Sequence, residues 1–178
     1  MSAGVGGGVS GLRLEPLGPQ HGLALLAGQD EQLAREIIGG RWEPDALADF
    51  LDRAARWRAD GPVREFAALE GGDPAGGTLV GGGGLHLLAP GLARGEAALN
   101  YWVLQGCRGR GLGHAIAALL VAQARADAGI ARLVLRIAPG NAGSLAVARG
   151  LGAQSTGAVE RHPADGRRAV ERWELGVR

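Results

Sequence analysis

The chain has 178 residues, of which 33 are glycine, and its formal net charge at neutral pH is +1. With 46% apolar residues it is too hydrophobic to be intrinsically disordered, and its glycines lack the Gly-X-Y period of collagen. The balanced charge and the 4% of aromatic residues exclude the basic, aromatic surface typical of nucleic-acid-binding proteins, so we expect no nucleic-acid partner.

Cysteine content and apolar runs predict a cytoplasmic protein without a bound metal or a membrane partner. The single cysteine, Cys107, excludes an internal disulfide and a zinc site built from several thiolates. The first residues lack the basic and apolar regions of a signal peptide. The longest apolar run, residues 115–122, is far too short to span a membrane.

Residues 1–11 are small and mostly glycine, which predicts a flexible N-terminal tail before one folded domain over residues 12–178. Within that domain, apolar residues recur with the period of a strand or of a helix, and turn residues separate the segments. The predicted elements are, in chain order, a strand over 12–15, helices over 19–27 and 45–59, strands over 65–70, 78–88 and 96–104, a helix over 112–128, a strand over 131–137, a helix beginning at Asn141, and strands over 153–161 and 168–177.

In this order most neighbouring strands can pair antiparallel through short connections. The sequence therefore predicts an α/β domain with a mixed, mostly antiparallel central sheet of about seven strands, flanked by about four helices.

The segment from Arg108 to His114, Arg-Gly-Arg-Gly-Leu-Gly-His, lies between a predicted strand and a predicted helix. Its glycines allow a tight turn, so several backbone N–H groups can converge on an anion at the positive end of the helix. Arg108 and Arg110 can add charge-assisted hydrogen bonds. This pattern is typical of a loop that binds phosphate groups.

Three kinds of phosphate-binding loop can be compared with this segment. A Walker A loop requires lysine, and the chain has none. A dinucleotide-binding G-x-G-x-x-G loop fits poorly, because His114 stands where its third glycine belongs. The pattern [Q/R]-x-x-G-x-[G/A] fits, with Arg108, Gly111 and Gly113 at its fixed positions.

With this loop and the motifs around it, the chain resembles the GCN5-related N-acetyltransferases, and most closely the branch of the ribosomal-protein-serine and -alanine acetyltransferases. The resemblance extends from Leu12 over nearly the whole chain. Its motifs are the opening Leu-Arg-Leu-x-Pro-Leu, Val80-Gly-Gly-Gly-Gly-Leu-His86, Asn100-Tyr-Trp-Val103, the loop from Arg108 to Gly113, Pro139-Gly-Asn-Ala-Gly-Ser144 and Leu151-Gly152.

The resemblance implies acetyl transfer from acetyl-CoA to a primary amine, directly and without a covalent acyl-enzyme. It implies that the strand ending at Val103 and Leu104 splays from the strand over 133–137 and that its free backbone groups bind the pantetheine arm. Asn141 matches an asparagine that binds the same arm, and Ser144 lies one turn further along the helix; Asn141 can equally be a plain helix cap. The residues that would hold the CoA diphosphate are those of the loop: Arg108, Gly109, Arg110, Gly111, Leu112, Gly113 and His114.

The groups that would move protons are less clear from the resemblance. Relatives often carry glutamate and tyrosine where this chain has Ala98 and Ala148. Glu96 can replace the missing base, since residues two apart share a strand face, although an exposed structural carboxylate is the alternative. His86 is a second candidate base, directly or through a water, because histidine titrates near neutral pH; a satisfied or exposed histidine without a catalytic role is the alternative.

Ser144 is the remaining acid, or the group that orients a water near the sulfur, and packing is the expected role of Tyr101. The sequence leaves two functions open. One is an N-acetyltransferase acting on a protein N-terminus or a small-molecule amine, and the other is a degenerate relative that binds acyl-CoA as a sensor without turnover. The acceptor is expected between residues 37–42 and the basic final hairpin around residues 161–168, in a monomer or a homodimer.

Overall fold

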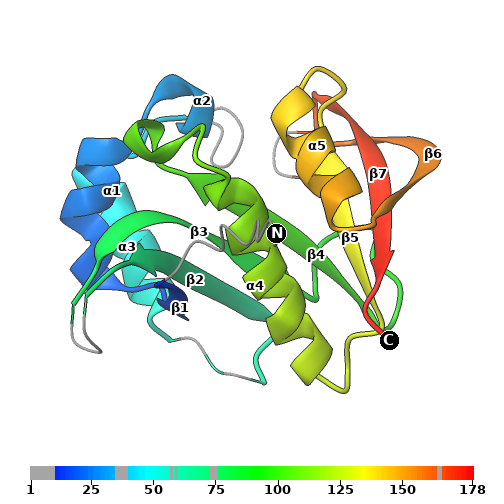
Figure 1. Cartoon of the computed structure of the whole chain (residues 1–178), viewed down its shortest axis with the longest axis horizontal. Coiled ribbons are helices and arrows are strands. Elements are labelled where there is room, and N and C mark those ends of the chain that lie inside the picture. Colours follow the sequence, from blue (N-terminus) through cyan, green and yellow to red (C-terminus); the bar gives the residue numbers. More distant parts are fainter. Residues whose placement is uncertain (1–10, 35–39, 57, 59, 73–75, 164–165) are drawn as a thin grey trace, which may run out of the picture.

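The computed structural model describes residues 11–34, 40–56, 58, 60–72, 76–163 and 166–178 (Figure 1). The predicted tail, apart from Gly11, lies outside the described residues, and so do residues 37–39 of the expected acceptor region. None of the helices in the described ranges is long and apolar enough to cross a membrane.

Seven strands form one mixed sheet in the order β1-β2-β3-β4-β5-β7-β6. All neighbouring pairs are antiparallel except β4 and β5, which are parallel, so the predicted mixed and mostly antiparallel sheet is confirmed. The strands are β1 (Leu12–Pro16), β2 (Val63–Glu70), β3 (Thr78–His86), β4 (Glu96–Val103), β5 (Arg132–Ile137), β6 (Gln154–Arg161) and β7 (Ala169–Gly176).

The helices agree with the predicted positions, with two differences. The helix expected over 45–59 ends at Ala54, soon after its last buried residue, Leu51. A short helix after Asp30, whose carboxylate accepts from the N–H of Leu33, was not predicted. The helices are α1 (Gly22–Gly28), α2 (Glu31–Leu33), α3 (Pro44–Ala54), α4 (Leu112–Ala126) and α5 (Ala142–Gly150), with 3-10 turns at Pro19–His21 and Gln105–Cys107.

Two hydrophobic clusters lie on opposite faces of the sheet, as alternation along β2 shows: Phe66 and Ala68 belong to one cluster, and Ala67 and Leu69 to the other. The first cluster contains the buried face of α4, which crosses β3 and β4 (Figure 1). The second contains apolar residues of α1, α2 and α3. The sheet is therefore covered by helices on both sides.

The parallel strands β4 and β5 pair at only three positions, from Glu96 with Arg132 to Ala98 with Val134, and then diverge (Figure 1). The N–H of Leu104 donates to Val80 O on the β3 side at 2.9 Å. Because backbone groups alternate in direction along a strand, those of Tyr101 and Val103 point into the gap toward β5. The expected splay of the central strands is confirmed.

Four consecutive glycines in β3 make two different close contacts. A Cβ at Gly81 or Gly83 would lie 2.7 Å from Ile116 or Leu120 of α4, respectively. A Cβ at Gly84, on the opposite face, would lie 2.7 Å from Glu65 Oε2 and 2.9 Å from His86 Nε2. Glycine at these positions therefore lets side chains on both faces of the sheet lie directly against the backbone of β3.

Candidate functional site

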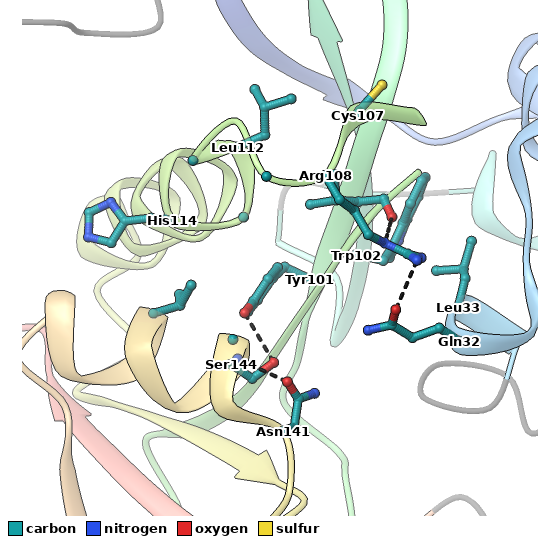
Figure 2. A pocket seen from close by; sticks show the side chains of 16 residues that line it. Gln32, Leu33, Tyr101, Trp102, Cys107, Arg108, Leu112, His114, Asn141 and Ser144 are labelled. Carbon is teal, nitrogen blue, oxygen red and sulfur yellow. Dashed lines mark hydrogen bonds between the residues drawn. The ribbon is translucent and has the colours of Figure 1, made fainter. Parts of the chain in front are cut away.

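A cleft of about 360 Å³ lies where β4 and β5 diverge, and we call it the splay cleft (Figure 2). Residues of α2, β4, the glycine loop and the first turns of α4 and α5 form its wall. They are Gln32, Leu33, Tyr101, Trp102, Val103, Cys107, Arg108, Gly109, Gly111, Leu112, Gly113, His114, Asn141, Gly143, Ser144 and Val147.

The glycine loop presents unpaired backbone donors to this cleft. Gly109 and Gly111 have φ values of +77° and +76°, which side-chain-bearing residues rarely adopt, and a Cβ at either position would meet no atom within 4 Å. Gly111 caps α4 and accepts its first helical hydrogen bond, from Ala115. The N–H groups of the first turn have no partner inside the helix, so they remain available as donors at its positive end.

Gly113 is required for a different reason from the other two loop glycines. A Cβ at Gly113 would lie 3.1 Å from Cε2 of Tyr101, closer than side chains normally pack. The missing side chain therefore allows the tyrosine ring to lie against the first turn of α4.

Arg108 lies at the cleft and joins the loop to α2. Its guanidinium donates to both carboxylate oxygens of Asp30, at 2.6 and 2.8 Å, and to Val103 O at 3.2 Å. The hydrogen bond from Arg108 is the main reason that the pKa of Asp30 falls to about 2, despite partial desolvation of the carboxylate. Arg108 is thus held in place at the cleft wall.

The structure does not bring two of the predicted binding residues to the cleft. Arg110 donates to both carboxylate oxygens of Glu70, at 2.8 Å, and is absent from the cleft wall. Leu104 packs into the second hydrophobic cluster, and its N–H is already bonded to Val80. Strand alternation explains the second difference, since Val103 and Leu104 face opposite directions.

Asn141 and Ser144 begin α5 at the wall of the cleft. Asn141 Oδ1 accepts from the N–H of Ser144 at 3.0 Å, so the helix-cap role of Asn141 is confirmed. The Tyr101 hydroxyl donates to Ser144 Oγ at 3.1 Å (Figure 2). Because the serine oxygen accepts this bond, its own hydrogen remains available for another acceptor in the cleft.

A second cavity of about 210 Å³ lies on the face of the sheet that α1, α2 and α3 cover, and we call it the aromatic cavity. His86 Nε2 donates to Glu65 Oε1 at 2.6 Å on its wall. Burial alone would lower the pKa of His86, but the hydrogen bond and the negative charge of Glu65 outweigh burial and raise that pKa above its ordinary 6.5. The wall consists of Leu17, Leu25, Leu33, Trp42, Phe50, Glu65, His86, Asn100 and Trp102.

Glu96 lies outside both cavities, in an ion-pair cluster at the start of β4. Its carboxylate is 8% exposed and pairs with Arg172 at 2.8 Å and Arg132 at 3.3 Å. Burial raises the pKa of Glu96, but hydrogen bonds from the Ala93 N–H and Arg172 and the two positive charges lower it below 4.5 overall. These contacts correct the expectation of a base here and indicate a structural carboxylate.

Glu96→Gln is expected to reduce the free energy of unfolding by about 2 kcal/mol at neutral pH, because it removes one of the three carboxylates that pair with the partly buried Arg172. The folded-state pKa of Glu96 is lowered, so its stabilisation is present above about 4.5 and is lost as the pH falls through the folded value. Urea unfolding at pH 7 and pH 3 checks this. The matched Glu43→Gln, at an exposed side chain without a capping bond, should change little, and equal effects at both positions would contradict the structural role.

The predicted acceptor region is only partly described. Trp42 contributes to the aromatic cavity, whereas residues 37–39 lie outside the described part. His162 and Arg168 of the final hairpin line a smaller cavity of about 100 Å³ together with Asn100 and Ser144. Asn100 thus lines both the aromatic cavity and this smaller cavity, and no site role was predicted for it.

Two comparisons with known proteins bear on this arrangement. The model of the family described as "Acetyltransferase (GNAT) domain" matches residues 12–154. No curated protein matches the chain significantly. Among solved structures, spermidine N-acetyltransferase from Vibrio cholerae, in complex with CoA and spermine, is 15% identical, with a TM-score of 0.75 and 94% and 96% of the two chains covered. An acetyltransferase of the GNAT family from Bacillus anthracis is 13% identical, with a TM-score of 0.74 and the same coverage.

Proposed function

Because the chain belongs to the GNAT acetyltransferase family, we propose that it transfers the acetyl group of acetyl-CoA directly to a primary amine. The observation that carries this proposal is that two features lie next to each other. One is the set of N–H groups without helical partners at the start of α4, and the other is the edge of β4 that the splay exposes. Such an arrangement suits a long cofactor that has a diphosphate at one point and an amide-containing arm next to it.

The residues of the splay cleft fit this cofactor. The amides from Gly109 to His114 would hold the diphosphate, and the open space beside Gly109 and Gly111 would admit it. The backbone N–H of Val103 would pair with the pantetheine arm, while the Val103 carbonyl accepts from Arg108 and so helps to keep the loop in place. The cofactor supplies an acetyl thioester, in which the acyl carbon is activated toward an amine.

His86 and Ser144 lie at the cavities on the two sides of β4 and would act on different protons. The amine nitrogen bonds to the acyl carbon, and the carbon–sulfur bond breaks. Since His86 Nε2 donates to Glu65, Nδ1 is the nitrogen that can take the proton from the amine, and Glu65 would stabilise the resulting imidazolium. Ser144 would donate a proton to the departing thiolate and regain one from the Tyr101 hydroxyl behind it, which would recover its own proton from solvent. His86 would release to solvent the proton that it took from the amine.

The rate constant kcat/KM is expected to rise with pH through a midpoint above 6.5, because only neutral His86 can accept a proton and its pKa is raised. Glu65→Gln removes the charge that raises this pKa while burial still lowers it, so the midpoint moves to lower pH. Asp49→Asn, which removes an exposed carboxylate on α3, should leave the midpoint in place. All three proteins are measured with the same amine, so that titration of the amine affects each pH profile equally. Equal midpoints in the wild type, Glu65→Gln and Asp49→Asn would show that His86 is not the base.

Ala148, which is fully buried, and Ala98 stand where relatives often carry tyrosine and glutamate, and they favour a second candidate, an acyl-CoA-binding module without turnover. Incubation with acetyl-CoA and a panel of amines and peptides, with free thiol as the readout, separates the two functions. Tight CoA binding without thiol release would support the module. If neither CoA nor acetyl-CoA raises the melting temperature, both proposals fail.

Two similarities favour different acceptors for this chain. The sequence resemblance to ribosomal-protein acetyltransferases favours a protein N-terminus, whereas the Vibrio cholerae neighbour is a spermidine N-acetyltransferase. A protein N-terminus and spermidine both present a primary amine, so the reaction chemistry does not distinguish between these acceptors. The lining of the aromatic cavity bears on the choice.

A further inference from the structure

The aromatic cavity is apolar over most of its wall. Trp42 stacks on Phe50 with their ring centroids 4.9 Å apart, and Trp102 faces the same space. Leu17 and Leu25, which are 2% and 4% exposed, complete the apolar side. Apolar surface of this kind binds an apolar group of a ligand, because removing that group from water is favourable and breaks few polar contacts.

The polar groups gather on the three central strands. Glu65 of β2 pairs in register with Gly84 of β3, and Gly84 pairs with Asn100 of β4, so the three positions form one row across the sheet. Gly84 carries no side chain in the middle of this row, and the Glu65–His86 pair occupies the space beside it. One end of the cavity can therefore hold an amine while the rest remains apolar.

Positive charge has little compensation in this cavity. Glu65 is the only carboxylate among its described lining residues, and His86 already engages it at 2.6 Å. A second ammonium group would lose water against leucine and aromatic side chains without gaining a carboxylate partner. The described part of the wall therefore disfavours a polyamine.

The aromatic cavity and the splay cleft share two lining residues, Leu33 and Trp102. A molecule in the aromatic cavity thus lies next to the place where the cofactor would bind. The aromatic cavity has a volume of about 210 Å³, which exceeds the roughly 150 Å³ of an apolar protein cavity that binds benzene. A benzene-sized group with a short linker fits this space.

We propose that the acceptor is a primary amine with a compact apolar body, aryl or branched alkyl, and no second positive charge. This inference rests on the proposed acetyltransferase function and narrows its substrate class. The amine would lie beside His86 and Asn100, and the body would lie against Trp42, Phe50 and Trp102. A free amine and the first residue of a peptide can both supply this chemistry.

The test compares kcat/KM for four acceptors by release of free thiol from acetyl-CoA. The acceptors are 2-phenylethylamine, 3-methylbutylamine, spermidine and the tripeptide Phe-Ala-Ala amide. For at least one apolar acceptor, kcat/KM is expected to be about ten times that for spermidine, or higher. The ratio of the tripeptide to 2-phenylethylamine shows whether the apolar amine is a chain terminus or a free molecule.

Phe50→Glu adds a second carboxylate to the described part of the wall. It is expected to raise the ratio of spermidine to 2-phenylethylamine about tenfold over the wild type. Leu23→Glu introduces the same charge on α1 at a side chain that is 85% exposed, outside the cavity, and should leave the ratio unchanged. If Phe50→Glu does not fold, the wild-type ratios alone decide.

The outcomes separate the two proposals. Preference of the wild type for spermidine would overturn the inference about the acceptor and leave the acetyltransferase function standing. Thermal stabilisation by CoA without thiol release from any amine would overturn the proposed function itself.

Discussion

Gly111→Val is expected to weaken acetyl-CoA binding at least a hundredfold while the domain remains folded. Gly111 adopts a φ of +76°, which a β-branched residue avoids at a cost of about 1–2 kcal/mol. That cost is smaller than the 5–15 kcal/mol that typically stabilises a domain. The added side chain would occupy the open space through which the loop amides reach a diphosphate. Calorimetric titration with acetyl-CoA, together with thermal unfolding, measures both effects.

Gly157 offers a matched control for this substitution. Its φ is +75°, a Cβ there would also meet no atom within 4 Å, and it lies in β6 away from the splay cleft. Gly157→Val should therefore cost similar stability and leave acetyl-CoA affinity unchanged. Equal affinity losses in the two variants would show that backbone strain, and not the loop's contact with the cofactor, causes the effect.

Ser144→Ala is expected to reduce kcat about a hundredfold with little change in KM, because it removes the group that would protonate the thiolate. Tyr101→Phe should cost about tenfold, since the serine hydroxyl remains but loses its donor at 3.1 Å. The double variant should be no slower than Ser144→Ala alone if the two hydroxyls act in sequence. Steady-state rates with saturating amine measure all three variants.

Ser155→Ala provides the control for a lost serine hydroxyl. Ser155 is exposed on β6, where its Oγ accepts from the N–H of Gly157, and its loss should leave kcat unchanged. Wild-type kcat in both Ser144→Ala and Tyr101→Phe would mean that the thiolate leaves without help from this pair. Proximity of the amine and the thioester would then account for the rate.

The sequence predicted what depends on local periodicity and on glycine chemistry. Period-two and period-3.6 patterns located all seven strands and the main helices, because most elements bury at least one face, although β6 is exposed along nearly its whole length. The loop from Arg108 to Gly113 was recognisable from the spacing of its glycines. Gly109 and Gly111 adopt positive φ, and Gly113 lets the Tyr101 ring lie close to the backbone.

The partners of the site residues were not predictable in the same way. Arg108 binds Asp30, which lies 78 positions earlier, and Tyr101 reaches Ser144 across 43 positions. These pairs depend on how helices pack across the splay, which no local pattern encodes. Glu65, His86 and Asn100 come together through strand register, so a paired hairpin alignment of β2, β3 and β4 was the one signal that could have found them.

The glycine run in β3 bears on how heat resistance could be engineered into this protein. Replacing glycine by alanine usually adds about 0.4–1 kcal/mol of stability, because it restricts the unfolded chain. In β3 a methyl group at Gly81 or Gly83 would push against α4, and one at Gly84 would push against the Glu65–His86 pair. A programme of thermostabilising substitutions would therefore need to leave this strand unchanged, because its glycines let α4 pack on one face of the strand and the Glu65–His86 pair on the other.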